Sequence, residues 1–211
     1  PEPLAQDDSG MLPTAYSVTP SSFDFTVLQG QTDSDTMVID NNNPVVMDFQ
    51  IKQPVQETFG STATVYSGTL RDRGNVYRVT TSTTLSMIEF YLNIPVSSQL
   101  YFFVYEGPSL TGLYNNIFQV YIPSSGTGTG WYSSGVINVN LIAGNFYYIG
   151  TAWDNTVTYY RPSTAGVVPT SFGTLETGMP ATLAQFPPIA SITQTWGSGS
   201  NPPYYQRLTT L

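Results

Sequence analysis

The stretch LSMIEFYLNI, residues 85–94, decides the fold class. Alternate positions form two faces of an extended chain: Ile88, Phe90 and Leu92 on one, and Met87, Glu89 and Tyr91 on the other. Successive side chains of a β-strand point to opposite sides, so a period of two residues predicts a half-buried strand. No window of the sequence shows a comparable helical period.

The same alternation recurs along the chain, with Gly, Pro, Asn and Ser between the apolar runs. The runs are SSFDFTVLQG (21–30), PVVMDFQIK (44–52), QLYFFVYEG (99–107), NNIFQVYIP (115–123), GVINVNLIAG (135–144), NFYYIGTAWDN (145–155), TVTYYRP (156–162) and PPYYQRLTTL (202–211). Short strands at such spacing are typical of all-β sandwiches. We therefore predict an all-β, antiparallel, jelly-roll-like sandwich with a small immunoglobulin-like unit at the N-terminus.

Aromatic residues on two neighbouring strands suggest an aromatic sheet face. Met87, Glu89 and Tyr91 form one face of residues 85–94. Tyr101, Phe103 and Tyr105 share one face of their strand. If this strand pairs with residues 85–94, an aromatic sheet face results that can bind a polysaccharide or a neighbouring subunit. We favour the other interpretation, in which both faces of these strands are buried.

Charge is distributed unevenly and suggests two units. Nine of the 14 acidic residues lie in residues 1–57, where Lys52 is the one basic residue; residues 58–211 are balanced. We divide the chain into an extended arm (1–15), a partial immunoglobulin-like strand unit (16–53) and a jelly-roll-like sandwich (54–211). The middle piece is too short for the roughly 100 residues of a full immunoglobulin domain, so its apolar face needs cover from elsewhere.

The residue types that are missing exclude several classes of function. The chain has no histidine and no cysteine, so it cannot form a Ser-His-Asp triad, a Cys-His pair, a disulfide or a thiolate metal site. Only 9% of residues are charged and the net charge is −8, which disfavours binding to nucleic-acid phosphates. No run approaches the roughly 18 apolar residues of a membrane span. We expect no nucleic-acid partner, no membrane span and no cofactor other than structural calcium.

The stretch GTGTGWYSSG, residues 126–135, places a tryptophan beside a flexible glycine loop. One interpretation makes Trp131 a binding surface on which a sugar ring stacks. The other makes it a side chain that covers one end of the sandwich, with the glycines letting the backbone bend around it. We favour the second interpretation and keep the first as the alternative. The candidate ligand-binding residues are Trp131, Tyr132, Trp153, Asp154 and Asn155.

Carboxylates could support glycosidic hydrolysis without histidine. Glu89, Glu106 and Asp154 are the candidates, but nothing in the sequence places two of them together. We therefore expect that the protein is not an enzyme.

Two other charged groups are candidates for local roles. Asp33, Asp35 and Asp40 offer oxygen ligands for structural Ca²⁺; the alternative is that they are solvated turn residues. The run 71–73, Arg-Asp-Arg, predicts a salt-bridged turn before a strand, or a contact with the acidic N-terminal unit of a neighbour.

Two parts of the chain resemble modules of secreted bacterial proteins. SVTPSSFDFTVLQGQTDSDTMVIDNNN resembles the opening strands of immunoglobulin-like modules. The runs RGNVYRVTTSTTLSMIEFYL, LYFFVYEG, GTGTGWYSSG, NLIAGNFYYIGTAW, SFGTLE and YYQRL resemble a module type of large bacterial extracellular proteins. The second resemblance implies a secreted jelly-roll-like sandwich and no established activity.

These observations predict a non-catalytic extracellular structural protein. A partial sandwich and an extended arm suggest a subunit of a surface fibre, matrix or layer that assembles through β-strand and edge contacts, with itself or with a neighbouring surface protein. The alternative is a carbohydrate-binding module of a secreted protein, with a polysaccharide as its ligand. The chain begins PEPLAQDDSG, without Met, which fits a mature secreted chain or a fragment. We therefore expect an extracellular or cell-surface location.

Overall fold

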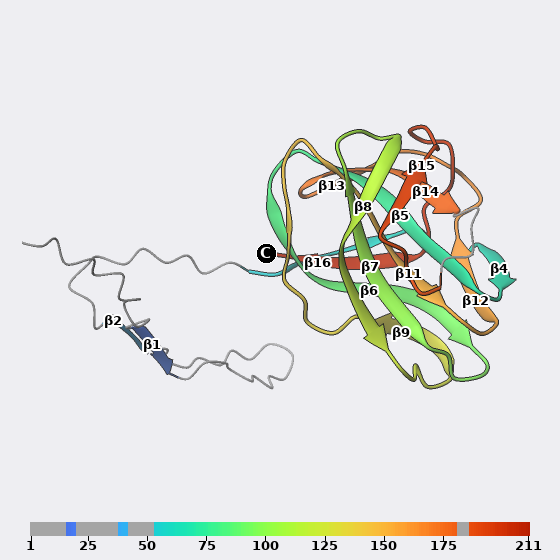
Figure 1. Cartoon of the computed structure of the whole chain (residues 1–211), viewed down its shortest axis with the longest axis horizontal. Coiled ribbons are helices and arrows are strands. Elements are labelled where there is room, and N and C mark those ends of the chain that lie inside the picture. Colours follow the sequence, from blue (N-terminus) through green and yellow to red (C-terminus); the bar gives the residue numbers. More distant parts are fainter. Residues whose placement is uncertain (1–15, 20–37, 42–52, 181–185) are drawn as a thin grey trace, which may run out of the picture. The chain divides into compact units, whose positions relative to one another are not determined.

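The computed structural model describes residues 16–19, 38–41, 53–180 and 186–211. Within these ranges, all regular secondary structure consists of β-strands (Figure 1). The chain divides into two units, residues 1–51 and 52–211. In the first unit, β1 (Tyr16–Thr19) pairs antiparallel with β2 (Val38–Asn41). The alternating strands predicted over residues 23–27 and 45–51 lie outside the described residues, so the immunoglobulin-like assignment stays a prediction.

The second unit contains two antiparallel sheets of seven strands each. The β6 sheet has the order β3-β16-β6-β12-β4, and β9 and β10 pair with the other side of β6. Its strands are β3 (Val55–Phe59), β4 (Thr64–Gly68), β6 (Thr83–Ile94), β9 (Gly128–Ser133), β10 (Val139–Leu141), β12 (Val157–Arg161) and β16 (Gln206–Thr210).

The β7 sheet has the order β13-β14-β5-β11-β7-β8-β15. Its strands are β5 (Arg71–Val79), β7 (Leu100–Gly107), β8 (Gly112–Ile122), β11 (Phe146–Trp153), β13 (Val168–Thr170), β14 (Gly173–Pro180) and β15 (Ser191–Gln194). Figure 1 shows β8 beside β7, and β15 beside only part of β8.

β6 confirms the alternation predicted for residues 85–94. Ile88, Phe90 and Leu92 are buried, whereas Glu89 and Tyr91 are partly exposed. β6 is a central strand with partners on both sides. Its buried main-chain N–H and C=O groups can therefore form hydrogen bonds with neighbouring strands. From Met87 to Asn93, the odd-numbered residues therefore lie on the outer face of the β6 sheet.

Residues 85–94 do not pair with residues 99–107, so the aromatic sheet face that such pairing would create does not form. β6 and β7 belong to different sheets, so the connection through Pro95 crosses from one layer to the other. Stacking the two strands face to face buries the apolar sides of both, and Phe90 and Phe102 join one core cluster. A flat hairpin would leave these two apolar faces side by side and in need of a further cover.

Two apolar clusters hold this unit together. The larger fills the space between the sheets and includes Tyr77, Phe90, Phe102 and Trp153. The smaller lies on the outer face of the β7 sheet and includes Phe103 and six other buried residues: Val76, Tyr105, Tyr114, Tyr148, Ala152 and Met179. The β7 strand is thus buried on both faces, as the favoured interpretation predicts, whereas one face of β6 stays partly exposed.

The protein is therefore all-β, with antiparallel sheets in a sandwich-like arrangement, as the alternation predicts. In the part of the chain that the structure describes, no helix has the length and apolar character needed to cross a membrane.

Candidate functional site

Trp131 lies in β9, which begins within the glycine-rich stretch, at Gly128. Gly126 and Gly128 have φ angles of 73° and 112°, a backbone region that residues with a Cβ rarely adopt. These glycines reverse the chain so that β9 can pair with β6, where Trp131 lies opposite Tyr91. Because directly opposite residues share a face, Trp131 points to the outer face of the β6 sheet.

Four aromatic side chains meet on this outer face: Tyr91, Trp131, Tyr160 and Tyr205. We call them the outer aromatic cluster. The centroid of Trp131 lies 4.8 Å from that of Tyr205 and 5.4 Å from that of Tyr91. Tyr91 lies 5.6 Å from Tyr160. The rings are tilted or perpendicular to one another, which is the favoured geometry of aromatic pairs, and all four remain partly exposed.

An ion pair borders the cluster. The guanidinium carbon of Arg207 lies 4.0 Å from the ring centroid of Trp131, and one Arg207 nitrogen lies 3.4 Å from a carboxylate oxygen of Glu89. The cation covers part of the tryptophan ring, and its charge is balanced by Glu89. The cluster therefore combines partly exposed rings with a charged donor and acceptor of no net charge, which suits an uncharged ligand rich in hydroxyl groups.

The interpretation of Trp131 as a cap at the end of the sandwich is wrong. Its ring packs against residues of the outer face and belongs to neither buried cluster. Tyr132, the next residue, points to the other face, packs against the main core and donates a hydrogen bond of 2.8 Å to the carbonyl of Gly128. The two side chains therefore do not form one site.

Trp153 is a core residue. It is 0% exposed, and its indole nitrogen donates a hydrogen bond of 2.8 Å to the carbonyl of Gly68. Asp154 accepts hydrogen bonds from the backbone amides of Gln99 and Asn155, so it orders the turn after β11. The structure corrects the proposed grouping of Trp131 with Trp153, because burial of the second ring leaves it no surface for a ligand.

The remaining acidic candidates have local partners. The Glu106 carboxylate accepts hydrogen bonds from the Tyr147 hydroxyl at 2.6 Å and the Asn145 amide at 2.8 Å. Asp40 is exposed on β2, while Asp33 and Asp35 lie outside the described residues. Within the described ranges, no three Asp, Glu, His or Cys side chains gather in a way that could hold a metal ion. Calcium binding stays a prediction.

The run 71–73 forms the start of β5 and not a turn. Asp72 and Arg73 are buried, and the Tyr148 hydroxyl donates a hydrogen bond of 3.2 Å to Asp72. The guanidinium of Arg73 lies 5.0 Å from the ring centroid of Tyr159 and donates a hydrogen bond to its hydroxyl. Arg73 is therefore part of the packing between the sheets, whereas Asp72 joins the smaller cluster on the outer face of the β7 sheet. The local sequence indicated neither role.

The free edge of β8 is a feature that sequence analysis missed. β15 pairs only with residues 112–115 of β8, and the last cross-strand bond runs from the Asn116 amide to Ala190. Among the described residues, no strand pairs with the outer side of residues 117–122. On the core side of this segment, Phe118, Val120 and Ile122 pack against the main cluster but stay partly exposed.

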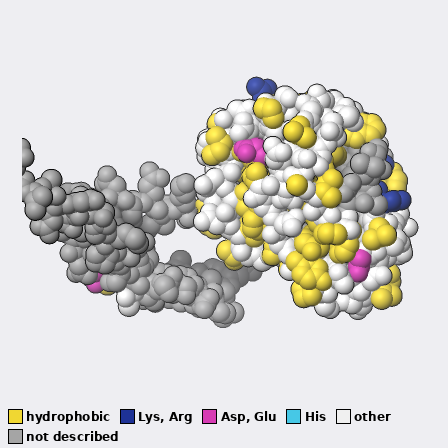
Figure 2. All heavy atoms as spheres, in the orientation of Figure 1, with side chains coloured by type: hydrophobic (Ala, Val, Ile, Leu, Met, Phe, Trp, Pro, Cys, Tyr) yellow, Lys and Arg dark blue, Asp and Glu magenta, His cyan; other side chains and the backbone are white. Residues whose placement is uncertain are grey.

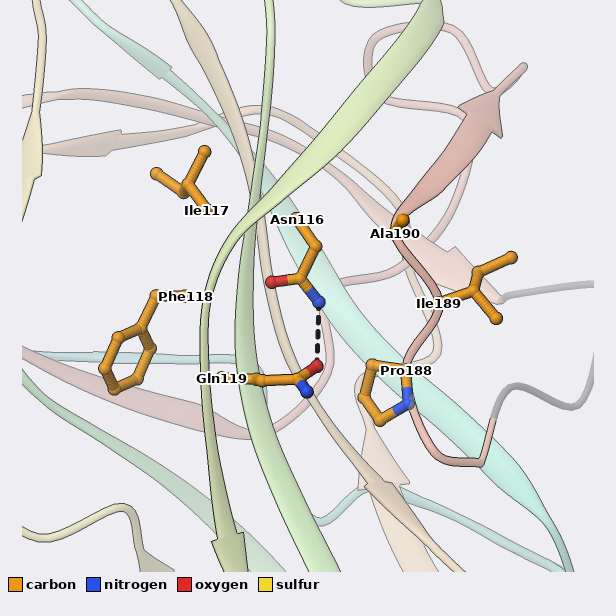
Figure 3. Close-up of a pocket in the computed structure, with 7 residues that line it drawn as sticks. All are labelled: Asn116, Ile117, Phe118, Gln119, Pro188, Ile189 and Ala190. Atoms are coloured by element: carbon orange, nitrogen blue, oxygen red, sulfur yellow. Dashed lines mark hydrogen bonds between the residues drawn. The ribbon is translucent and has the colours of Figure 1, made fainter.

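A groove lies beside the point where β8 and the chain before β15 separate. Figure 3 shows Asn116 and Gln119 directed into it towards Pro188, whereas Ile117 and Phe118 point away. The groove holds about 450 Å³, and the amide of Asn116 donates a hydrogen bond of 3.0 Å to Gln119. Its lining is polar on one side and apolar on the other, with no charged group among the lining residues.

Charged side chains are few on the molecular face in Figure 2, which is covered by uncharged polar and scattered hydrophobic groups. No protein-family model, no curated protein and no solved structure matches this chain. The candidate surfaces therefore rest on the geometry alone: the outer aromatic cluster on one sheet and the free edge of β8 on the other.

Proposed function

We propose that this chain is a non-catalytic extracellular structural protein, a subunit of a surface fibre, matrix or layer that assembles through β-strand contacts at a sheet edge. The observation that supports this function best is the free edge of β8 at residues 118–122. Its partners are further copies of the chain or a neighbouring surface protein.

Two physical effects favour strand addition at this edge. Main-chain groups of an unpaired strand are available to an incoming strand, and each new ladder bond satisfies both partners. The added strand also places alternate side chains beside Phe118, Val120 and Ile122. No described strand flanks these three residues on their outer side. Both effects act together only if the incoming segment is extended and apolar on one face.

The amino-acid composition supports the same function. Proteins that remain monomeric protect exposed edges with charged residues, above all lysine. This chain contains a single lysine, Lys52, and 9% charged residues. An extracellular location agrees with this composition and stays part of the proposal.

Assembly is tested by light scattering and negative-stain electron microscopy at rising protein concentration. We expect ordered oligomers or filaments from the wild-type chain, and a shift towards monomer for Tyr121→Lys, which adds a charge to a side chain that is 43% exposed. Val136→Lys, at a position 92% exposed and outside β8, is the matched control and leaves assembly unchanged. A wild-type chain that stays monomeric at every concentration contradicts the proposal.

A second candidate function, carbohydrate recognition, is favoured by the outer aromatic cluster. Trp131 presents its ring on a sheet face beside the donor Arg207 and the acceptor Glu89. Rings stack on the apolar faces of sugars, while paired charged groups bind hydroxyls without favouring a charged ligand.

This candidate is tested with a panel of neutral polysaccharides. We expect Trp131→Ala to reduce binding at least tenfold, and Tyr121→Ala, on the other sheet, to leave it unchanged. Near-ultraviolet circular dichroism confirms that each variant is folded. Equal binding by wild type and Trp131→Ala would remove the cluster as a glycan site.

A further inference from the structure

We propose that the free edge of β8 pairs with the same edge of a second copy, antiparallel, about a two-fold axis that passes beside Val120. This inference rests on the proposed function and names the partner at that edge. The self-pairing segment is residues 118–122, FQVYI.

A two-fold axis perpendicular to the sheet sets the register. In an antiparallel pair related by such an axis, one residue lies opposite its own copy, and residues equally distant from it lie opposite each other. With Val120 on the axis, Phe118 lies opposite Ile122 of the second copy, and Gln119 opposite Tyr121. This is the register that pairs the whole segment, and it keeps core-facing residues opposite core-facing residues.

Pairing buries apolar surface on the core-facing side of the segment. Phe118, Val120 and Ile122 contact the main core cluster and remain partly exposed, because no described strand follows β8 at this position. In the paired state each of these side chains gains an apolar neighbour across the axis. The two β7 sheets then continue into one another, and the apolar layer beneath them is covered on both sides of the axis.

The absence of charge on this part of the sheet allows the same strand segment of two copies to come into contact. The chain carries a net charge of −8, so two copies repel one another overall. Residues 112–122 of β8 and residues 100–105 of β7 contain no charged residue. Contact at this strip therefore brings no like charges face to face, which a self-complementary interface requires.

Two of the other outer strands, β13 and β3, are less suited to pairing. β13 has three residues and contains Pro169, which has no amide hydrogen to donate. β3 carries Glu57, whose carboxylate accepts hydrogen bonds from Ser171. The N-terminal arm, residues 1–15, combines three prolines with three acidic residues, so it complements an uncharged ladder poorly.

The local backbone limits the pairing to the proposed segment. The register between β7 and β8 shifts at Ile117, so a β-bulge ends the regular ladder there. Pro123 follows the segment at its other end. Between these two limits the strand is regular, and among the described residues it pairs only with β7.

The chain has no cysteine, so introduced cysteines report the register directly. Directly opposite residues in an antiparallel pair have Cα atoms about 4.5–5.5 Å apart, within reach of a disulfide, and diagonal neighbours lie farther apart. We expect Val120→Cys to cross-link with itself under mild oxidation. Gln119→Cys and Tyr121→Cys cross-link at least tenfold faster when mixed than either does alone.

The controls separate folding from pairing. Val136→Cys, exposed and outside β8, gives the background rate of cross-linking. Thermal unfolding under reducing conditions shows that each variant is folded, and analytical ultracentrifugation of the wild-type chain gives its oligomeric state. A Val120→Cys rate equal to that of Val136→Cys overturns the inference.

The outcomes distinguish this inference from the proposed function. If Val120→Cys cross-links but the wild-type chain forms dimers only, the self-pairing is right and the fibre, matrix or layer function is wrong. If the wild-type chain forms larger assemblies while Val120→Cys reacts at the background rate, assembly uses another contact and the self-pairing is wrong. If deletion of residues 1–15 abolishes assembly while Val120→Cys reacts at the background rate, assembly depends on the arm and the self-pairing is wrong.

Discussion

Trp131 and Trp153 show how the position of a residue in a strand decides its role. Each lies in a strand that is paired within its sheet. Tyr132 follows the first in sequence, and Asp154 follows the second. Trp131 lies opposite Tyr91 on an outer face, whereas Trp153 lies opposite Leu100 on the core face. The side chains of a strand alternate, so a shift of one residue would exchange these environments.

Replacement of the two tryptophans should therefore have different effects on stability. We expect Trp153→Ala to lower the free energy of unfolding by about 3–5 kcal/mol, because it removes a buried ring and leaves a cavity. Trp131→Ala removes contacts with Tyr205 and Arg207 on a partly exposed face and should cost about 1–2 kcal/mol. Urea unfolding of both variants measures the difference, and equal losses would contradict the assignment.

Tyr204 predicts a loss of stability at alkaline pH. Burial raises the pKa of its phenol to about 12, although the neighbouring Arg73 and Arg161 lower it in part. An unfolded tyrosine titrates near pH 10, so from about pH 10 to about pH 12 only the unfolded chain releases this proton. The free energy of unfolding should therefore fall through this window, by about 2–3 kcal/mol from this residue.

Tyr204→Phe is the matched variant for the alkaline effect, because it keeps the ring and removes the titrating group. Urea unfolding of both proteins at intervals up to about pH 12 should give a shallower decline for the variant. Parallel curves would show that other groups cause the loss.

At the scale of the strand, Gly74 and Gly150 allow two aromatic rings to lie close to the β7 sheet. The two glycines are opposite each other on β5 and β11. A Cβ at Gly150 would lie 2.5 Å from the Phe103 ring and from the carbonyl oxygen of Arg73, and one at Gly74 would lie 2.6 Å from the Tyr148 ring. Neither the rings nor the backbone can give way without disturbing the smaller cluster.

Gly150→Ala should therefore lower the free energy of unfolding by about 2–3 kcal/mol through overpacking. Gly130→Ala in β9 is the control, since a Cβ there meets no atom within 4 Å. Its effect should be close to zero or slightly stabilising, because alanine restricts the unfolded chain. Chemical unfolding of the two variants compares them, and a neutral Gly150→Ala would mean that the sheet relaxes around the added methyl group.

Sequence alternation predicts strands better than it predicts their partners. Residues 85–94 have the faces that their pattern indicates, yet β6 and β7 stack in separate sheets and do not form a hairpin. The local pattern is the same in both arrangements. The choice depends on how much apolar surface is buried between strands distant in sequence, which no short stretch contains.

For the whole molecule, the division at residues 51 and 52 predicts that the sandwich folds by itself. The buried residues of both described core clusters lie between Phe59 and Leu208, inside the second unit. We expect a chain of residues 53–211 to unfold in one cooperative transition, with the near-ultraviolet spectrum of the full-length protein. A broad transition, or loss of that spectrum, would show that the first unit is needed for the packing of the second.

The sequence alone determined that the protein is all-β, because alternation with a period of two is a local property of the chain. It also excluded chemistry that requires histidine or cysteine. Only the tertiary structure decided that Trp131 joins Tyr91, Tyr160 and Tyr205, and that Trp153 is buried. It also decided that no described strand flanks residues 117–122 of β8 on their outer side. These features depend on which strands meet, and strand partners are set by long-range burial of apolar surface and not by neighbouring residues.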